Sequence, residues 1–94
     1  MIWNKQIIVT NHAQERFCQR KINFSKKNNN IIRQILLDLE PLNVRTISRI
    51  KNRENTYRVI TKQGKTYIIL EEDEACFVKT VYKSKISYNK LKLN

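Results

Sequence analysis

One short stretch of the chain carries the residue types that phosphate chemistry requires. His12, the only histidine, is followed at spacings of four and eight residues by Arg16 and Arg20. Residues three, four and seven apart share one face of a helix, so His12, Arg16 and Gln19 would form one stripe, with Arg20 at its edge. An imidazole can take or give a proton near neutral pH, and a guanidinium binds phosphate oxygens through a planar fork of donors. The stretch therefore predicts a site for phosphate chemistry.

A simpler interpretation of the same stretch stays open. A histidine at the start of a helix can pack or form local hydrogen bonds without touching a ligand. Arg16 and Arg20 can be solvated surface charges, as on any basic helix. The sequence alone does not choose between a basic helix and a site.

The last predicted strand offers two more candidates, Thr80 and Tyr82. Alternate side chains of a strand point to opposite faces of a sheet, so these two residues share a face. If Phe77 and Val81 face the helices, Thr80 and Tyr82 line the open face of the sheet. The opposite orientation is equally compatible with the sequence.

Cations and aromatic residues in the second half could bind a nucleic acid. Arginine matches phosphate geometry, and tyrosine rings stack on exposed bases. The alternative for each tyrosine is packing within the sheet. The candidates for nucleic-acid binding are Arg49, Tyr57, Arg58, Tyr67 and Lys79.

Charge is the strongest global signal. Nineteen Lys and Arg stand against eight Asp and Glu, and the net charge of the 94 residues is +11. Such a chain attracts polyanions, with an affinity that falls steeply with salt. The single glycine excludes a glycine-rich phosphate loop, and two cysteines with one histidine cannot make a four-ligand zinc site. We therefore expect no metal and no cofactor.

The start of the chain resembles neither a signal peptide nor a membrane span. We expect a cytoplasmic protein that is not bound to a membrane. In that compartment Cys18 and Cys76 would stay reduced and would act as small hydrophobic residues.

Periodicity predicts an α+β fold, with two N-terminal helices packed on an antiparallel sheet of three or four strands. Ile7-Ile8-Val9 is either a short strand or a hydrophobic staple, and Thr10 or Asn11 caps the first helix. One domain would span 1–83, and 84–94 would be a basic tail or a short helix. The expected helices cover 12–21 and 31–40, and the expected strands cover 44–50, 56–61, 65–70 and 76–82.

The motif His-Ala-x-x-Arg-x-x-x-Arg-x-Ile, followed by a second helix and by a meander that ends in Lys79-Thr80-Val81-Tyr82, resembles a known group of proteins. These are small bacterial and phage proteins on the fold shared by barnase, EndoU, colicin-type nucleases and RelE-like toxins. The resemblance spans about residues 7–83. It implies a RelE- or barnase-like fold and a metal-independent endoribonuclease, often the toxin of a toxin–antitoxin or phage–host conflict system.

The resemblance also implies site residues and partners. Carried over by position, the catalytic residues are His12, Arg16, Arg20, Thr80 and Tyr82. The substrate would be RNA, as tRNA, mRNA or ribosomal RNA, and the product would end in a 2′,3′-cyclic phosphate. An acidic antitoxin or immunity protein would be a second partner.

Two other functions remain open. A basic module on the same scaffold could bind nucleic acid without cutting it. A phage-encoded inhibitor could use its charge to cover an acidic host partner. In either case the chain would not be an enzyme.

Overall fold

The fold of the chain is given by a computed structural model, which describes residues 2–19 and 30–83. Two α-helices, two 3-10 turns and a five-stranded sheet with the strand order β1-β5-β4-β3-β2 make up this part of the chain. The elements in chain order are η1 (Ile2–Asn4), β1 (Gln6–Val9), α1 (Asn11–Gln19), α2 (Ile31–Asp38), η2 (Pro41–Asn43), β2 (Val44–Arg49), β3 (Thr56–Thr61), β4 (Lys65–Glu71) and β5 (Ala75–Lys83). The predicted tail, 84–94, lies outside the described residues.

The α+β class is confirmed, but the predicted sheet is wrong in strand number and direction. The apolar run at Gln6–Val9 is a true strand, which pairs in parallel with β5 while the other strands pair antiparallel. This pairing joins distant parts of the chain, since Gln6 lies opposite Ala75. No turn signal in the sequence marks such a partner, whereas hairpins are marked by their turns.

Local chemistry sets the ends of the helices. The Thr10 hydroxyl accepts a hydrogen bond from the Ala13 amide at 3.1 Å, so Thr10 and not Asn11 caps α1. Asn30 caps α2 in the same way, through its side-chain oxygen and the Arg33 amide at 3.0 Å. The second helix ends before Pro41, which cannot continue the hydrogen-bonding pattern.

The β3–β4 hairpin forms where the sequence predicts it. Gly64 adopts a φ of 88° in the turn, a conformation that costs glycine little because it has no Cβ. The Gly64 amide donates to the Thr61 carbonyl at 3.0 Å, which closes the turn. The strands on either side, β3 and β4, match the predicted ranges to within one residue.

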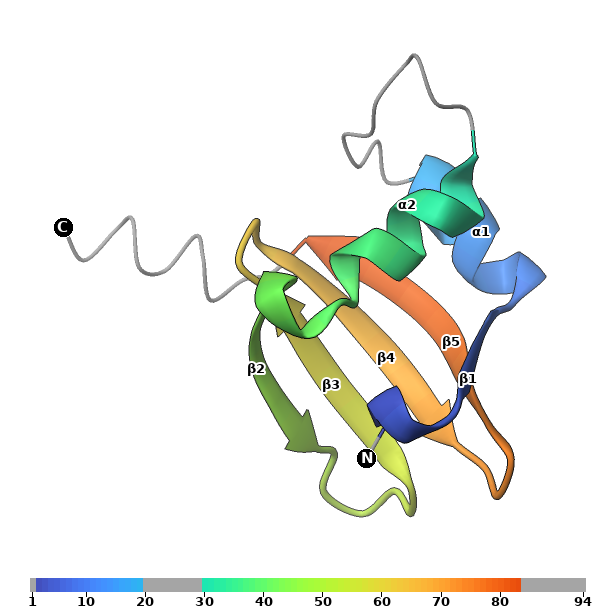
Figure 1. Ribbon diagram of the computed structural model, residues 1–94, viewed down its shortest axis with the longest axis vertical. Helices are drawn as coiled ribbons and strands as arrows, with labels where there is room; N and C mark the ends of the chain where they lie inside the picture. The colour runs from blue at the N-terminus through green and yellow to red at the C-terminus, as the bar shows by residue number, and fades with distance from the viewer. Residues whose placement is uncertain (1, 20–29, 84–94) are drawn as a thin grey trace, which may run out of the picture.

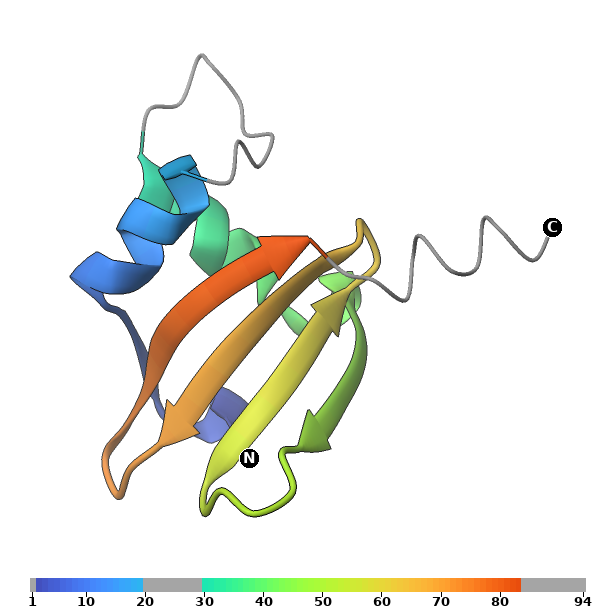
Figure 2. The same ribbon diagram turned by 180° about the vertical axis from the view of Figure 1, so that it is seen from behind.

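The two faces of the sheet differ in what they contact. We call the face that bears Val59, Tyr67, Ile69, Val78 and Val81 the inner face. These side chains are buried in one cluster with residues from both helices. Figures 1 and 2 show α1 and α2 on the same side of the sheet, with β5 and β4 crossing behind them in Figure 1. The helical members of the cluster are Ala13, Phe17, Ile35 and Leu39.

A bulge in β5 decides which residues reach the other face, which we call the outer face. Ile68 pairs with Thr80, but Ile69 pairs with Val78, so Lys79 is an extra residue in the strand. Because of this extra residue, Cys76, Val78 and Val81 all point inward, and the strict alternation assumed for the strand is wrong. Thr80 and Tyr82 are nevertheless placed on the outer face.

A buried polar group ties α2 to β4 beneath the apolar cluster. The Asp38 carboxylate accepts from the Lys65 ammonium at 2.7 Å and from the Tyr67 hydroxyl at 2.6 Å. The three residues are at most 7% exposed. The burial of the Tyr67 hydroxyl, reinforced by the neighbouring carboxylate, raises the pKa of Tyr67 above its usual value, so the hydroxyl stays a donor.

Within the described part of the chain, no helix is long and apolar enough to cross a membrane.

Candidate functional site

His12 lies in the first turn of α1, and that turn is fixed to β5. The Thr10 backbone amide and the Thr10 hydroxyl both donate to the Val78 carbonyl, at 3.3 and 2.7 Å. Val78 directly precedes the bulge at Lys79. The start of the helix is therefore held beside the bulged part of β5, which brings together segments 68 residues apart in the chain.

Arg16 contacts the imidazole of His12 directly. The Arg16 Nε donates to His12 Nε2 at 3.3 Å, and Arg16 Nη1 donates to Gln19 Oε1 at 3.2 Å. The predicted helical stripe of His12, Arg16 and Gln19 is thus present as a chain of hydrogen bonds. Nε2 of His12 is the acceptor in this contact, because a guanidinium nitrogen can only donate.

A hollow of about 370 Å³ opens beside His12 on the outer face of the sheet. Ile68 and Leu70 of β4 supply its apolar surface, and threonines from β3 and β5 supply hydroxyl groups. The lining residues are His12, Arg53, Thr56, Ile68, Leu70, Lys79 and Thr80. The size and the mixture of apolar surface with a few polar groups are typical of a small-ligand site.

The charge of this hollow favours an anion. Its lining contains two cations, Arg53 and Lys79, and no carboxylate. Both cations are exposed, and Arg16 adds a third positive charge through its contact with His12. The Thr56 hydroxyl donates to the Glu54 carbonyl at 3.0 Å, so a phosphate group bound at His12 would meet positive charge and the Thr80 hydroxyl. Positive charge and hydrogen-bond donors stabilise charge on phosphate oxygens.

The structure brings together part of the predicted catalytic set. Thr80 lines the hollow with His12, and Arg16 contacts His12 from the same helix. Tyr82 is the next outward residue of β5 after Thr80, on the outer face but outside the lining. Arg20 lies outside the described residues.

The predicted nucleic-acid-binding residues divide between the two faces. Lys79 lines the hollow, and Arg58 lies on the outer face directly opposite Ile68, whose side chain also lines it. Arg49 pairs with Tyr57, which pairs with Ile69, so both belong to the inner face. They are therefore separated from the hollow by the sheet itself.

The prediction that Tyr67 stacks on a base is wrong. Its side chain is 0% exposed, and its hydroxyl is used by Asp38. Tyr57 is half-buried against the apolar cluster, on the face of the sheet away from the hollow, and its predicted role in nucleic-acid binding stays a prediction. For Tyr67 the alternative, packing within the sheet, holds.

Arg53 and Thr56 belong to the hollow but were not among the predicted site residues. Thr56 and Arg58 share a face of β3 because they are two residues apart, so an outward Arg58 implies an outward Thr56. Arg53 had a weaker signal, a cation in the polar loop that ends where Thr56 begins. Its direction depends on the loop conformation, which the sequence does not fix.

Among the residues that the structure describes, no group of three or more His, Cys, Asp or Glu side chains is placed to hold a metal ion.

Comparison of the chain with protein-family models, with curated proteins and with solved structures finds no match. The function must therefore be argued from the site itself.

Proposed function

We propose that this protein is a metal-independent endoribonuclease whose active site is the hollow beside His12. The observation that carries the proposal is the position of the only imidazole at the edge of a hollow that holds cations and hydroxyls but no carboxylate. The net charge of +11 supports a polyanionic substrate. The α+β fold is compatible with the RelE- and barnase-like resemblance of the sequence.

The chemistry requires one proton acceptor, one proton donor and positive charge. In the proposed step, neutral His12 takes the proton of the ribose 2′-hydroxyl, and the freed oxygen attacks the adjacent phosphorus. The bond from phosphorus to the 5′-oxygen breaks, and that oxygen takes up a proton from Tyr82 or from water. The products are a 2′,3′-cyclic phosphate and a 5′-hydroxyl end.

The cations would stabilise the charge that builds on the phosphate during this step. Lys79 and Arg53 line the hollow, and Arg16 would turn from His12 to a phosphate oxygen, because a charged acceptor binds a guanidinium more strongly than a neutral imidazole does. This exchange would also free His12 Nε2 to accept the proton. Thr80 would donate a hydrogen bond from the strand.

The biological setting is part of the proposal. A ribonuclease that needs no cofactor would degrade the RNA of the cell that makes it. We therefore expect a toxin whose activity is inhibited by an acidic antitoxin or immunity protein. The substrate would be RNA in the form of tRNA, mRNA or the ribosome.

The test is cleavage of end-labelled RNA by the purified protein in excess EDTA, with His12→Ala beside it. Wild type should leave cyclic-phosphate ends, and His12→Ala should lose cleavage while keeping the melting temperature of wild type. Lys62→Ala is the matched control, since Lys62 is exposed in the β3–β4 turn and does not line the hollow.

A second candidate is a protein that binds RNA without cutting it. It is favoured by the lining of the hollow, which offers one imidazole and neither a carboxylate nor a second imidazole as a partner in proton transfer. Cleavage by His12→Ala at the wild-type rate would exclude His12 as the base. If the protein leaves both naked RNA and ribosomal RNA uncut but binds naked RNA and ribosomes with an affinity that depends on salt, the second candidate is established.

A further inference from the structure

A second hollow lies in the loop between β2 and β3. It has a volume of about 440 Å³ and is formed by one continuous segment of the chain. Its lining residues are Arg49, Ile50, Lys51, Asn52, Arg53 and Glu54. Three of these six side chains are cations and one is an acid, so this hollow too favours an anion.

Backbone contacts give the loop a defined shape. The Ile50 amide donates to the Thr56 carbonyl at 2.8 Å, and the Arg53 amide donates to the Ile50 carbonyl at 3.2 Å. Asn52 and Asn55 adopt positive φ values of 70° and 55°, a region that asparagine tolerates better than most residues. The side chains between these points are therefore presented outward from a fixed turn.

The cations of the loop form no ion pair in the described part of the structure. Arg49, Lys51 and Arg53 are exposed, and none forms an ion pair with a described carboxylate. The acidic residue of the loop, Glu54, is also outside any such pair. Positive charges this close repel one another, and a bound polyanion would remove that repulsion.

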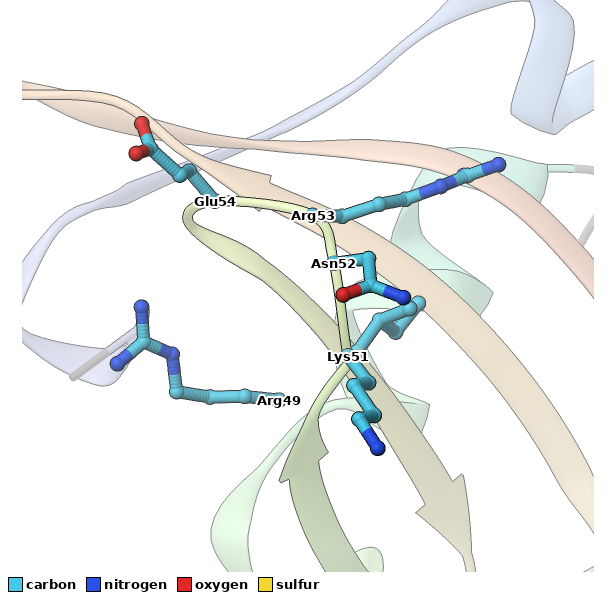
Figure 3. Close-up of a pocket in the computed structure, with 6 residues that line it drawn as sticks. Arg49, Lys51, Asn52, Arg53 and Glu54 are labelled. Carbon is cyan, nitrogen blue, oxygen red and sulfur yellow. The ribbon is translucent and has the colours of Figure 1, made fainter.

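Arg53 connects the loop to the site at His12, because it lines both hollows. Figure 3 shows the Arg53 side chain pointing to the opposite side of the loop from the side chains of Arg49 and Glu54. Lys51 points in a third direction, from the part of the loop that directly follows β2. The cations thus continue from the outer face, at Arg53, around the loop to Arg49.

We propose that the β2–β3 loop is a second phosphate-binding subsite for the RNA strand that occupies the hollow beside His12. The inference rests on the proposed function in one respect, that this strand is the substrate. A nucleic acid carries a phosphate at every nucleotide, so one strand can meet Arg53 and then Lys51 and Arg49 in succession. An acidic protein would also meet positive charge here, but its carboxylates do not repeat at a fixed spacing.

The experiment compares short and long substrates cut at the same bond. The preferred cleavage step is first located in a long RNA, and the corresponding dinucleotide and versions extended on either side are then synthesised. For the wild-type protein, kcat/KM should be higher for RNA extended on one side than for the dinucleotide, because the extended RNA has a lower KM. Arg49→Ala/Lys51→Ala should lose most of that rise, with a much smaller effect on the dinucleotide, whereas Lys62→Ala should keep it.

Binding gives a second, independent measurement of the loop. The binding of the extended RNA is measured with variants that also carry His12→Ala, so that the RNA is not cut. The magnitude of the slope of log affinity against log salt should decrease by roughly 0.7 for each phosphate contact that is removed. Affinity should fall roughly tenfold at about 0.1 M salt for the two substitutions together. Lys62→Ala in the same background should change neither quantity.

The outcomes separate the two proposals. Equal kcat/KM for dinucleotide and extended RNA, or an extension effect that survives Arg49→Ala/Lys51→Ala, overturns the subsite and leaves the ribonuclease intact. If wild type cuts no RNA, the proposed function fails, and the salt slope alone decides whether the loop binds a strand. An unchanged slope together with loop-dependent binding of an acidic protein would assign the loop to a protein partner and overturn the inference.

Discussion

The Nε of Arg16 lies 3.3 Å from Nε2 of His12 and donates a hydrogen bond to it. The two residues are four apart on α1, a spacing at which side chains meet on the helix surface. The contact places a guanidinium next to the atom of the only imidazole in the chain that would accept the substrate proton.

Arg16→Ala should lower RNA cleavage by about 100-fold, the usual cost of removing one donor that stabilises developing charge. The free energy of unfolding should change by less than about 0.5 kcal/mol, because the contact is on the surface of the helix. Arg16→Lys should recover only part of the rate, since an ammonium lacks the planar fork. The measurements are single-turnover cleavage and urea unfolding.

Arg33→Ala is the matched control for Arg16, because Arg33 is an exposed arginine on α2 that does not line the hollow. If Arg16→Ala cleaves RNA at the wild-type rate, Arg16 is only a solvated helix residue. That result would leave His12 without an activating neighbour among the described residues.

Asp38→Asn should destabilise the fold by about 3–5 kcal/mol, because it leaves the Lys65 ammonium buried without a counter-charge. Urea unfolding followed by circular dichroism measures this loss. Combining Asp38→Leu with Lys65→Met removes both charges and should cost less than either single change. A double variant no better than the singles would mean that the hydrogen bond to Tyr67, and not charge pairing, holds the cluster together.

Stability should fall as pH rises above about 10, the ordinary pKa of tyrosine. Above that pH the unfolded chain releases the Tyr67 proton, while the folded chain retains it because burial raises its pKa. The unfolded state then binds fewer protons, and the free energy of unfolding falls by up to about 1.4 kcal/mol per pH unit from this one group. Urea unfolding between neutral and alkaline pH gives the slope, and Tyr67→Phe should make it shallower. An identical slope in Tyr67→Phe would show that Tyr67 titrates normally.

Asp38 is a charged residue within a helical stripe that is otherwise apolar, and this position in the sequence indicated a buried polar contact. Asp38 lies three residues after Ile35 and next to Leu39, on the apolar stripe of α2, where a carboxylate needs a partner. Lys65 and Tyr67 alternate with Ile69 on one face of β4 and supply that partner. Asp38 therefore predicts a buried polar partner, whereas the identity of that partner depends on how α2 packs on β4.

Other features of the site could not be predicted from the sequence. The helical stripe of His12 and Arg16 follows from spacing alone, and so do most of the strands. The pairing of β1 with β5 and the bulge at Lys79 do not, since both depend on contacts between distant parts of the chain. These two features decide that His12 meets Thr80, whereas the registers of β2, β3 and β4 decide that Arg49 does not reach the hollow.

The two faces of the sheet can be tested with two tyrosines that the sequence could not distinguish. Tyr82 lies on the outer face after Thr80, whereas Tyr57 lies on the inner face against Ile69. Tyr82→Phe removes the proposed proton donor and should slow cleavage by about 100-fold, the lower end of the range for loss of general acid catalysis. Tyr57→Phe should leave cleavage unchanged, because its hydroxyl is on the far side of the sheet from the hollow.

Single-turnover cleavage at neutral pH measures both tyrosine variants, and thermal unfolding checks that each variant folds. Because phenylalanine keeps the aromatic ring, a slower rate with an unchanged melting temperature isolates the loss of the Tyr82 hydroxyl. An equal loss of rate from the two substitutions would contradict the assignment of the faces, because side chains on opposite faces of the sheet cannot both reach one substrate. An unchanged rate in Tyr82→Phe would exclude Tyr82 as the proton donor.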